Sequence, residues 1–125
     1  MATDGPEAEV DLERLPEISG GDTEFEQELA GEYVNQAAEL LQEIGEAAAR
    51  GDAEAARRAA HTLKGSSQTI GARRVAGVAA EIEQLAAAGD LSAAAAGLDR
   101  ARASLAAARQ ILDRYFGSDA YRRAA

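Results

Sequence analysis

The residues of this chain with the clearest chemical potential surround its single histidine, His61. Lys64 and Gly65 follow it at three and four residues, the spacings that share one face of an α-helix. On a helical wheel the apolar residues of this segment gather on the other side, so the imidazole should point to solvent. A glycine inside a helix costs roughly 1 kcal/mol relative to alanine, but it leaves open space beside the ring. A solvent-facing imidazole with an ammonium group and open space beside it is the arrangement expected of a histidine that accepts a phosphoryl group.

Other polar side chains nearby are candidates for contacts with this ring or with a partner. Arg57 and Arg58 lie about one turn before the histidine, and Gln68 lies two turns after it. Because nearby cations disfavour protonation of an imidazole, this setting predicts a neutral, nucleophilic ring. We expect Ser66 and Ser67 to serve helix packing. A surface histidine without a function remains the alternative on these features alone. The lack of cysteine and of a second histidine argues against a zinc site.

The segment around the histidine resembles the signature of histidine-containing phosphotransfer (HPt) domains. It reads His61-Thr62-Leu63-Lys64-Gly65-Ser66-Ser67, followed by Ile70-Gly71-Ala72. The similarity extends more loosely over residues 10–116. It implies a four-helix bundle in which His61 is the phosphorylated nucleophile, with Lys64 and Gly65 supporting the phosphoryl group. Many members carry a glutamine on the neighbouring helix that bonds the ring; here Glu83 aligns with it and Gln84 follows, so either is a candidate for orienting the imidazole.

The elements that position these residues are predicted to be helices, and the chain to be all-α. Apolar residues recur at three- and four-residue spacings over approximately 22–50, 52–70, 72–88 and 91–115. Glycine followed by aspartate precedes three of these segments, which predicts a helix start at each aspartate. Such short junctions favour an antiparallel four-helix bundle. A weaker apolar pattern around Pro16 predicts a short N-terminal helix or turn across the end of the bundle. We therefore expect a mobile tail over 1–9, the bundle over 10–116 and a C-terminal tail over 117–125.

Composition narrows the class of protein. The chain has 125 residues, enough for one domain, and its net charge of −9 argues against a nucleic-acid partner. The segment 52–74 is the exception, with five basic and two acidic residues, and such a patch suits an acidic protein surface. No apolar run approaches the ~18 residues of a membrane span. We expect a cytoplasmic monomer that does not enter a membrane.

Three functions fit these observations. The first is a phosphorelay carrier, in which His61 accepts a phosphoryl group from a receiver-domain aspartate and passes it to another receiver. The partners would then be response-regulator receivers or a hybrid histidine kinase, with no cofactor in this chain and Mg²⁺ on the receiver. Docking is expected to use apolar residues of the first two helices, with Phe25 and Tyr33 as candidates.

The other two functions are the phosphate-accepting module of a chemotaxis-type histidine kinase and a non-catalytic helical bundle that binds a receiver or a kinase. The sequence contains no Gly-rich nucleotide loop and no kinase motif. We therefore expect a phosphotransfer intermediate, not an enzyme that takes phosphate from ATP.

Overall fold

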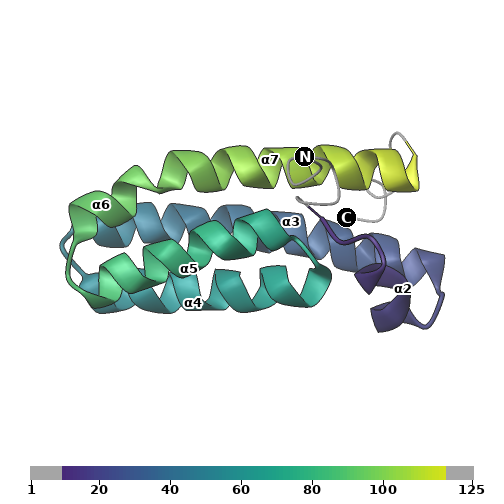
Figure 1. Ribbon diagram of the computed structural model, residues 1–125, viewed down its shortest axis with the longest axis horizontal. Coiled ribbons are helices and arrows are strands. Elements are labelled where there is room, and N and C mark those ends of the chain that lie inside the picture. Colours follow the sequence, from purple (N-terminus) through teal and green to yellow (C-terminus); the bar gives the residue numbers. More distant parts are fainter. Residues whose placement is uncertain (1–9, 118–125) are drawn as a thin grey trace, which may run out of the picture.

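The computed structural model describes residues 10–117 as a bundle of helices (Figure 1). Four long helices run side by side, with the short α2 at one end and the short α6 at the other. No helix within these residues is long and apolar enough to cross a membrane. The predicted tail over 1–9 and most of that over 117–125 lie outside the described residues. The elements are α2 (Arg14–Ser19), α3 (Thr23–Ala49), α4 (Ala53–Ile70), α5 (Arg73–Ala87), α6 (Leu91–Ala96) and α7 (Leu98–Phe116).

The glycine–aspartate pairs mark helix starts, as predicted. The carboxylates of Asp22, Asp52 and Asp90 each accept a hydrogen bond from the backbone N–H three residues later, at 3.1, 3.0 and 3.1 Å. Each bond satisfies one of the N–H groups that the first turn of a helix leaves unpaired. The aspartate of the second pair caps α4, so a local sequence signal sets the start of the helix that carries the histidine.

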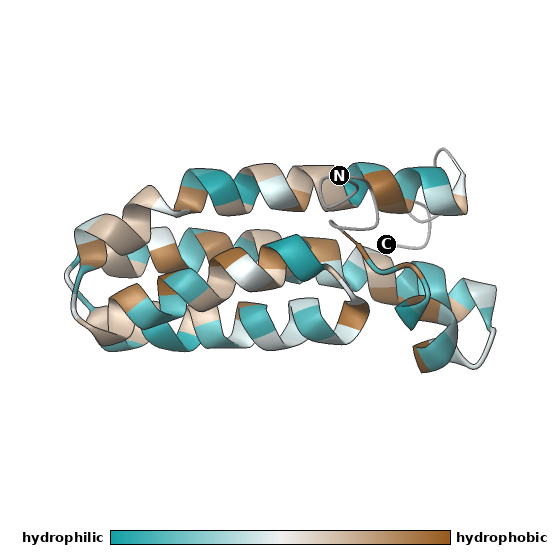
Figure 2. Ribbon diagram, in the orientation of Figure 1, coloured by the Kyte–Doolittle hydropathy of each residue, from teal (hydrophilic) through white to brown (hydrophobic). Residues whose placement is uncertain are grey.

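Small side chains allow the helices to approach closely. Figure 2 shows hydrophobic and hydrophilic residues alternating along each long helix, as expected of helices with one buried face. Alanine fills many fully buried positions, and a few larger side chains complete the core; α4 packs extensively on both α3 and α5. The fully buried core includes Leu15, Ala30, Ala37, Ile44, Ala56, Ala60, Leu63, Val75, Ala79, Ile82, Ala94, Ala101 and Ala108.

The segment before α2, residues 10–13, is hydrogen-bonded to the turn between α4 and α5, and we call it the leader. The backbone N–H of Asp11 donates to the carbonyl of Gly71 at 2.7 Å. Gly71 has a φ of +89°, and a Cβ there would lie 2.7 Å from the Asp11 carbonyl oxygen and 2.8 Å from Cγ of Arg14. Only glycine fits this left-handed conformation and this close approach. The turn that joins α4 to α5 is therefore braced by the leader.

The last predicted helix is interrupted. The segment expected to be continuous from Leu91 to Tyr115 divides at Gly97 into α6 and α7. A Cβ on Gly97 would lie 3.1 Å from Cγ1 of Ile82, which is fully buried on α5. The break thus lies where the chain passes closely over α5, a tertiary contact that apolar spacing alone does not reveal.

Candidate functional site

The histidine lies on the solvent face of α4. Ala56, Ala59 and Leu63 turn into the core, with exposed fractions of 0%, 6% and 0%, whereas the side chain of His61 is 62% exposed. The 100° step between helical residues places the imidazole opposite that apolar stripe. The predicted orientation is confirmed, and the ring is accessible to a partner.

One edge of the imidazole is held by the neighbouring helix. Nδ1 of His61 lies 2.8 Å from Oε2 of Glu83 on α5, and the Glu83 side chain is only 17% exposed. A carboxylate can only accept a hydrogen bond, so the ring donates from Nδ1–H. In the neutral ring this assigns the lone pair to Nε2, which has no hydrogen bond to any of the described residues. The nucleophilic nitrogen therefore faces outward.

The second oxygen of the same carboxylate holds Lys64. Its Nζ lies 2.8 Å from Oε1 of Glu83, and the lysine side chain is 27% exposed. The hydrogen bond from Lys64 is the largest cause that lowers the pKa of Glu83, and the bond from His61 lowers it further, whereas burial opposes both. Glu83 is thus a carboxylate at neutral pH. It bridges imidazole and ammonium group, and both point to the same side of the α4–α5 pair.

The arginines do not surround the ring as the sequence analysis predicted. Nε and Nη2 of Arg57 donate to the two oxygens of Glu54 at 2.9 and 2.7 Å, and Arg58 lies 3.6 Å from the same carboxylate. The charged group nearest the imidazole is an acid, Glu83, so the expectation of a ring in a cationic setting is wrong. The i,i+3 and i,i+4 spacing to Glu54 was the sequence signal for this pairing.

Gly65 borders the ring on α4. A Cβ built on it would meet no heavy atom within 4 Å, and its φ is not in the left-handed region. Among the described residues, neither packing nor backbone conformation therefore requires glycine at this position. The remaining explanation is the surface that a side chain here would present to a partner at His61.

The other two candidates are not part of the cluster. Gln68 and Gln84 are exposed, and the structure gives neither side chain a hydrogen bond to His61. The fold thus brings together His61, Lys64 and Glu83 and leaves the two glutamines on the surrounding surface.

A buried polar pair below the site was missed by the sequence analysis. Tyr33 of α3 is 5% exposed, and its hydroxyl shares a 2.7 Å hydrogen bond with Oγ of the fully buried Ser67. Burial raises the pKa of the Tyr33 phenol to about 12. The expectation that Tyr33 docks a partner is therefore wrong, because its ring belongs to the core. Phe25, the other candidate, is 42% exposed. The packing role predicted for Ser67 is confirmed, and Ser66 donates to the carbonyl of Leu63 at 3.3 Å.

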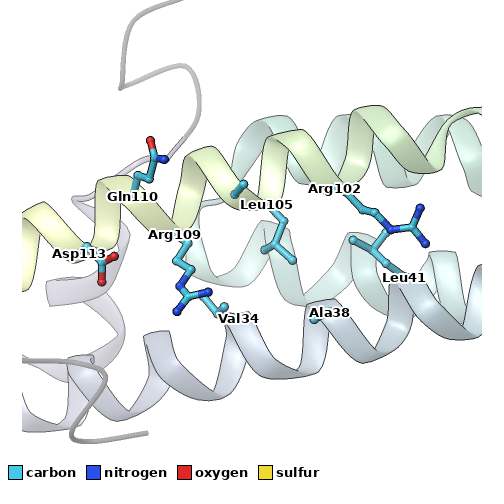
Figure 3. Close-up of a pocket in the computed structure, with 9 residues that line it drawn as sticks. Val34, Ala38, Leu41, Arg102, Leu105, Arg109, Gln110 and Asp113 are labelled. Atoms are coloured by element: carbon cyan, nitrogen blue, oxygen red, sulfur yellow. The ribbon is translucent and has the colours of Figure 1, made fainter. Parts of the chain in front are cut away.

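A separate groove lies between α3 and α7 (Figure 3). It encloses about 580 Å³ and is lined by apolar side chains, including Val34 and Leu105, with Arg102 and Arg109 also in its lining. It shares no residue with the histidine site. Over residues 10–117 there is also no group of three or more acidic or histidine side chains placed to hold a metal ion. The cluster at His61 is thus the candidate site for chemistry.

Comparison with known proteins gives two findings. Residues 28–111 match the family described as Hpt domain. The fold is similar to the crystal structure of histidine-containing phosphotransfer protein B (HptB) from Pseudomonas aeruginosa PAO1, with a TM-score of 0.77 and 27% identity. That similarity covers 85% of this chain and 93% of the other. No curated protein matches the sequence.

Proposed function

This chain belongs to the Hpt domain family and is a histidine phosphotransfer carrier of a phosphorelay, and we propose that His61 is the residue that carries the phosphoryl group. The observation that supports this most strongly is the geometry of the ring: Nδ1 is bonded to Glu83 at 2.8 Å while the imidazole is 62% exposed. A ring fixed at one nitrogen presents the other in a defined direction. Such prior orientation is the main protein contribution to a phosphoryl transfer.

In the proposed reaction the phosphoryl donor is an aspartyl phosphate on a receiver domain. The Nε2 lone pair of His61 attacks phosphorus in line with the bond to the aspartate oxygen, and that carboxylate leaves. The reverse reaction loads a second receiver. A divalent cation, expected to be Mg²⁺, would be held by the receiver's own acidic residues. This chain supplies the nucleophile and its orientation.

Lys64 and Gly65 have supporting roles in this proposal. The ammonium group of Lys64, 2.8 Å from Glu83, is one turn from the ring and carries the charge that transferred oxygens require. Gly65 leaves the approach to Nε2 clear, because no atom of residues 10–117 comes within 4 Å of the position that its Cβ would take. An ammonium beside the phosphoryl group and an unobstructed path to phosphorus together support in-line transfer.

The proposed partners are response-regulator receivers or the receiver of a hybrid kinase. A receiver's phosphorylation pocket is acidic, and the segment 52–74 is the basic part of an otherwise acidic chain. The exposed Phe25, together with Ile18 at 36% exposure, offers apolar area for docking. We place the carrier in the cytoplasm as a monomer, and we propose that it receives its phosphoryl group from a protein partner and not from ATP.

The test is transfer from a receiver that a small-molecule donor has phosphorylated with a radioactive label. The label should move onto this chain in an acid-labile, base-stable form, and His61→Gln should remove it because the chain has one histidine. Arg109→Gln, in the groove between α3 and α7, is the control that should transfer normally. Labelling of the His61→Gln variant would refute the proposal. Labelling only with ATP and a kinase, without any receiver, would instead favour the chemotaxis-type module.

A further inference from the structure

We propose that Glu83 is a positioning residue that keeps the Nδ1 proton on the ring during both steps of the relay, so that phosphorylated His61 is a readily discharged donor. This inference rests on the proposed function of His61. It concerns a property that carriers with the same fold need not share: how easily the phosphoryl group leaves.

The contact that carries the inference joins a charged acceptor to the nitrogen opposite the reacting one. Oε2 of Glu83 is 2.8 Å from Nδ1, and the glutamate side chain is 17% exposed. Only the carboxylate side of the bond is partly shielded from water, because the ring is 62% exposed. A charged acceptor nevertheless makes the hydrogen bond roughly twice as strong as a neutral one. A neutral amide at the same position would orient the ring, but it would hold the proton less firmly.

The other charges around the imidazole come from its own helix and are already paired. Lys64 is held by Glu83, and Arg57 and Arg58 are held by Glu54. From α5, the side chain that contacts the ring is Glu83. The charge in direct contact with the Nδ1 proton is therefore the negative charge of Glu83.

The balance of the reaction shows why this proton matters. When the Nε2 lone pair forms the N–P bond and the P–O bond to the donor aspartate breaks, the ring keeps its Nδ1 proton and becomes a positively charged phosphoimidazolium. The Glu83 carboxylate offsets that charge, and no proton has to move. When the acceptor aspartate attacks phosphorus, the N–P electron pair returns to Nε2 and the ring leaves as neutral imidazole.

Loss of the Nδ1 proton would change the leaving group. The ring would then have to depart as an imidazolate anion, which is a far poorer leaving group, and the phosphoryl group would stay on the carrier. Glu83 opposes this loss. Lys64, bonded to the other oxygen of the carboxylate, reduces the repulsion between the glutamate and the phosphoryl oxygens. The pair thus retains the proton without excluding the phosphoryl group.

The experiment compares Glu83→Gln with Glu81→Gln. Both changes remove one negative charge from α5, but Glu81 is 56% exposed and pairs with Arg100 at 2.8 Å instead of contacting the ring. Each full-length variant is checked for folding by circular dichroism and loaded by a phosphorylated receiver. Its discharge to a second receiver is then timed from pH 6 to pH 10. The single histidine also allows ¹⁵N NMR to follow Nδ1 directly in the phosphorylated protein.

Discharge of the wild-type protein should slow as the pH rises and Nδ1 loses its proton. In Glu83→Gln the midpoint of this decline should lie about one pH unit lower, equivalent to a tenfold change in proton affinity. Above both midpoints the variant should discharge about tenfold more slowly, and below both midpoints the rates should converge. Glu81→Gln should match the wild type throughout.

Two results would overturn the inference while leaving the proposed function intact. One is a Glu83→Gln protein that loads normally and has the wild-type midpoint in both the kinetic and the NMR titrations. The other is slowing of equal size at every pH, which would indicate a structural defect. Failure of wild-type His61 to accept any label would instead refute the proposed function.

Discussion

Replacing Gly65 with alanine should stabilise this protein and impair it at the same time. A helix-interior glycine costs roughly 1 kcal/mol relative to alanine, and a Cβ at this position would meet no heavy atom within 4 Å. The full propensity gain should therefore be realised. For a domain of this size, a gain of about 1 kcal/mol raises the melting temperature by roughly 4 °C.

Phosphotransfer should fall because the new methyl group lies where the receiver must approach Nε2. Misplacement of reacting groups by about 1 Å can cost on the order of 100-fold in rate. We expect a loss of roughly tenfold for Gly65→Ala and roughly 100-fold for Gly65→Gln, whose longer side chain covers more of the approach. Thermal melts followed by circular dichroism and rapid-quench transfer from a labelled receiver measure the two effects separately.

Gly45→Ala is the matched control. Gly45 is also inside a helix, and its Cβ would make an ordinary 3.4 Å contact with Cδ1 of Leu98, away from the histidine. This variant should gain stability and transfer at the wild-type rate. Wild-type transfer by Gly65→Ala would show that clearance beside His61 is not required. A lower melting temperature for Gly65→Ala would show that the glycine has a structural role that the geometry does not reveal.

Three further variants test the supporting residues. Tyr33→Phe should cost about 1 kcal/mol in urea unfolding, because Ser67 loses its partner, with transfer unchanged; reduced transfer in the folded variant would contradict a purely structural role. Because the folded pKa of Tyr33 is about 12, the wild type should lose stability as the pH rises from 10 to 12, and Tyr33→Phe should lose less. Lys64→Met should slow transfer at least tenfold without unfolding the protein, and an unchanged rate would remove the lysine from the mechanism. Because the pKa of Glu83 is lowered on folding, its contribution to stability is present above its ordinary value and lost as the pH falls below it, so Glu83→Gln should weaken the acid dependence of unfolding.

The helices and the direction of the histidine could be predicted from the sequence because the signals for both are local. Apolar spacing follows from the 3.6-residue turn, and Asp52 caps α4 through a bond to a residue only three positions away. The outward direction of His61 follows from the same periodicity, since Leu63 and its stripe had to be buried. The break at Gly97 escaped prediction; it lies where the chain passes close to Ile82 on another helix, an approach that apolar spacing does not reveal.

The charges around the ring depended on the tertiary structure. Sequence position alone placed Arg57 and Lys64 near His61. Both side chains are long and flexible, so each pairs with a carboxylate that the fold brings within reach, Glu54 for Arg57 and Glu83 for Lys64. Docking of α5 against α4 brings in Glu83 from 22 residues away, at 2.8 Å from both the ring and Lys64. Tyr33 and Ser67 are 34 residues apart in the sequence, and they likewise meet only because α3 packs against α4. The sequence by itself determined that a histidine stands on the surface of a helical bundle. Only the packing of α5 on α4 decided that its inner nitrogen faces a carboxylate, because which charges meet across two helices depends on their register and not on their separation along the chain.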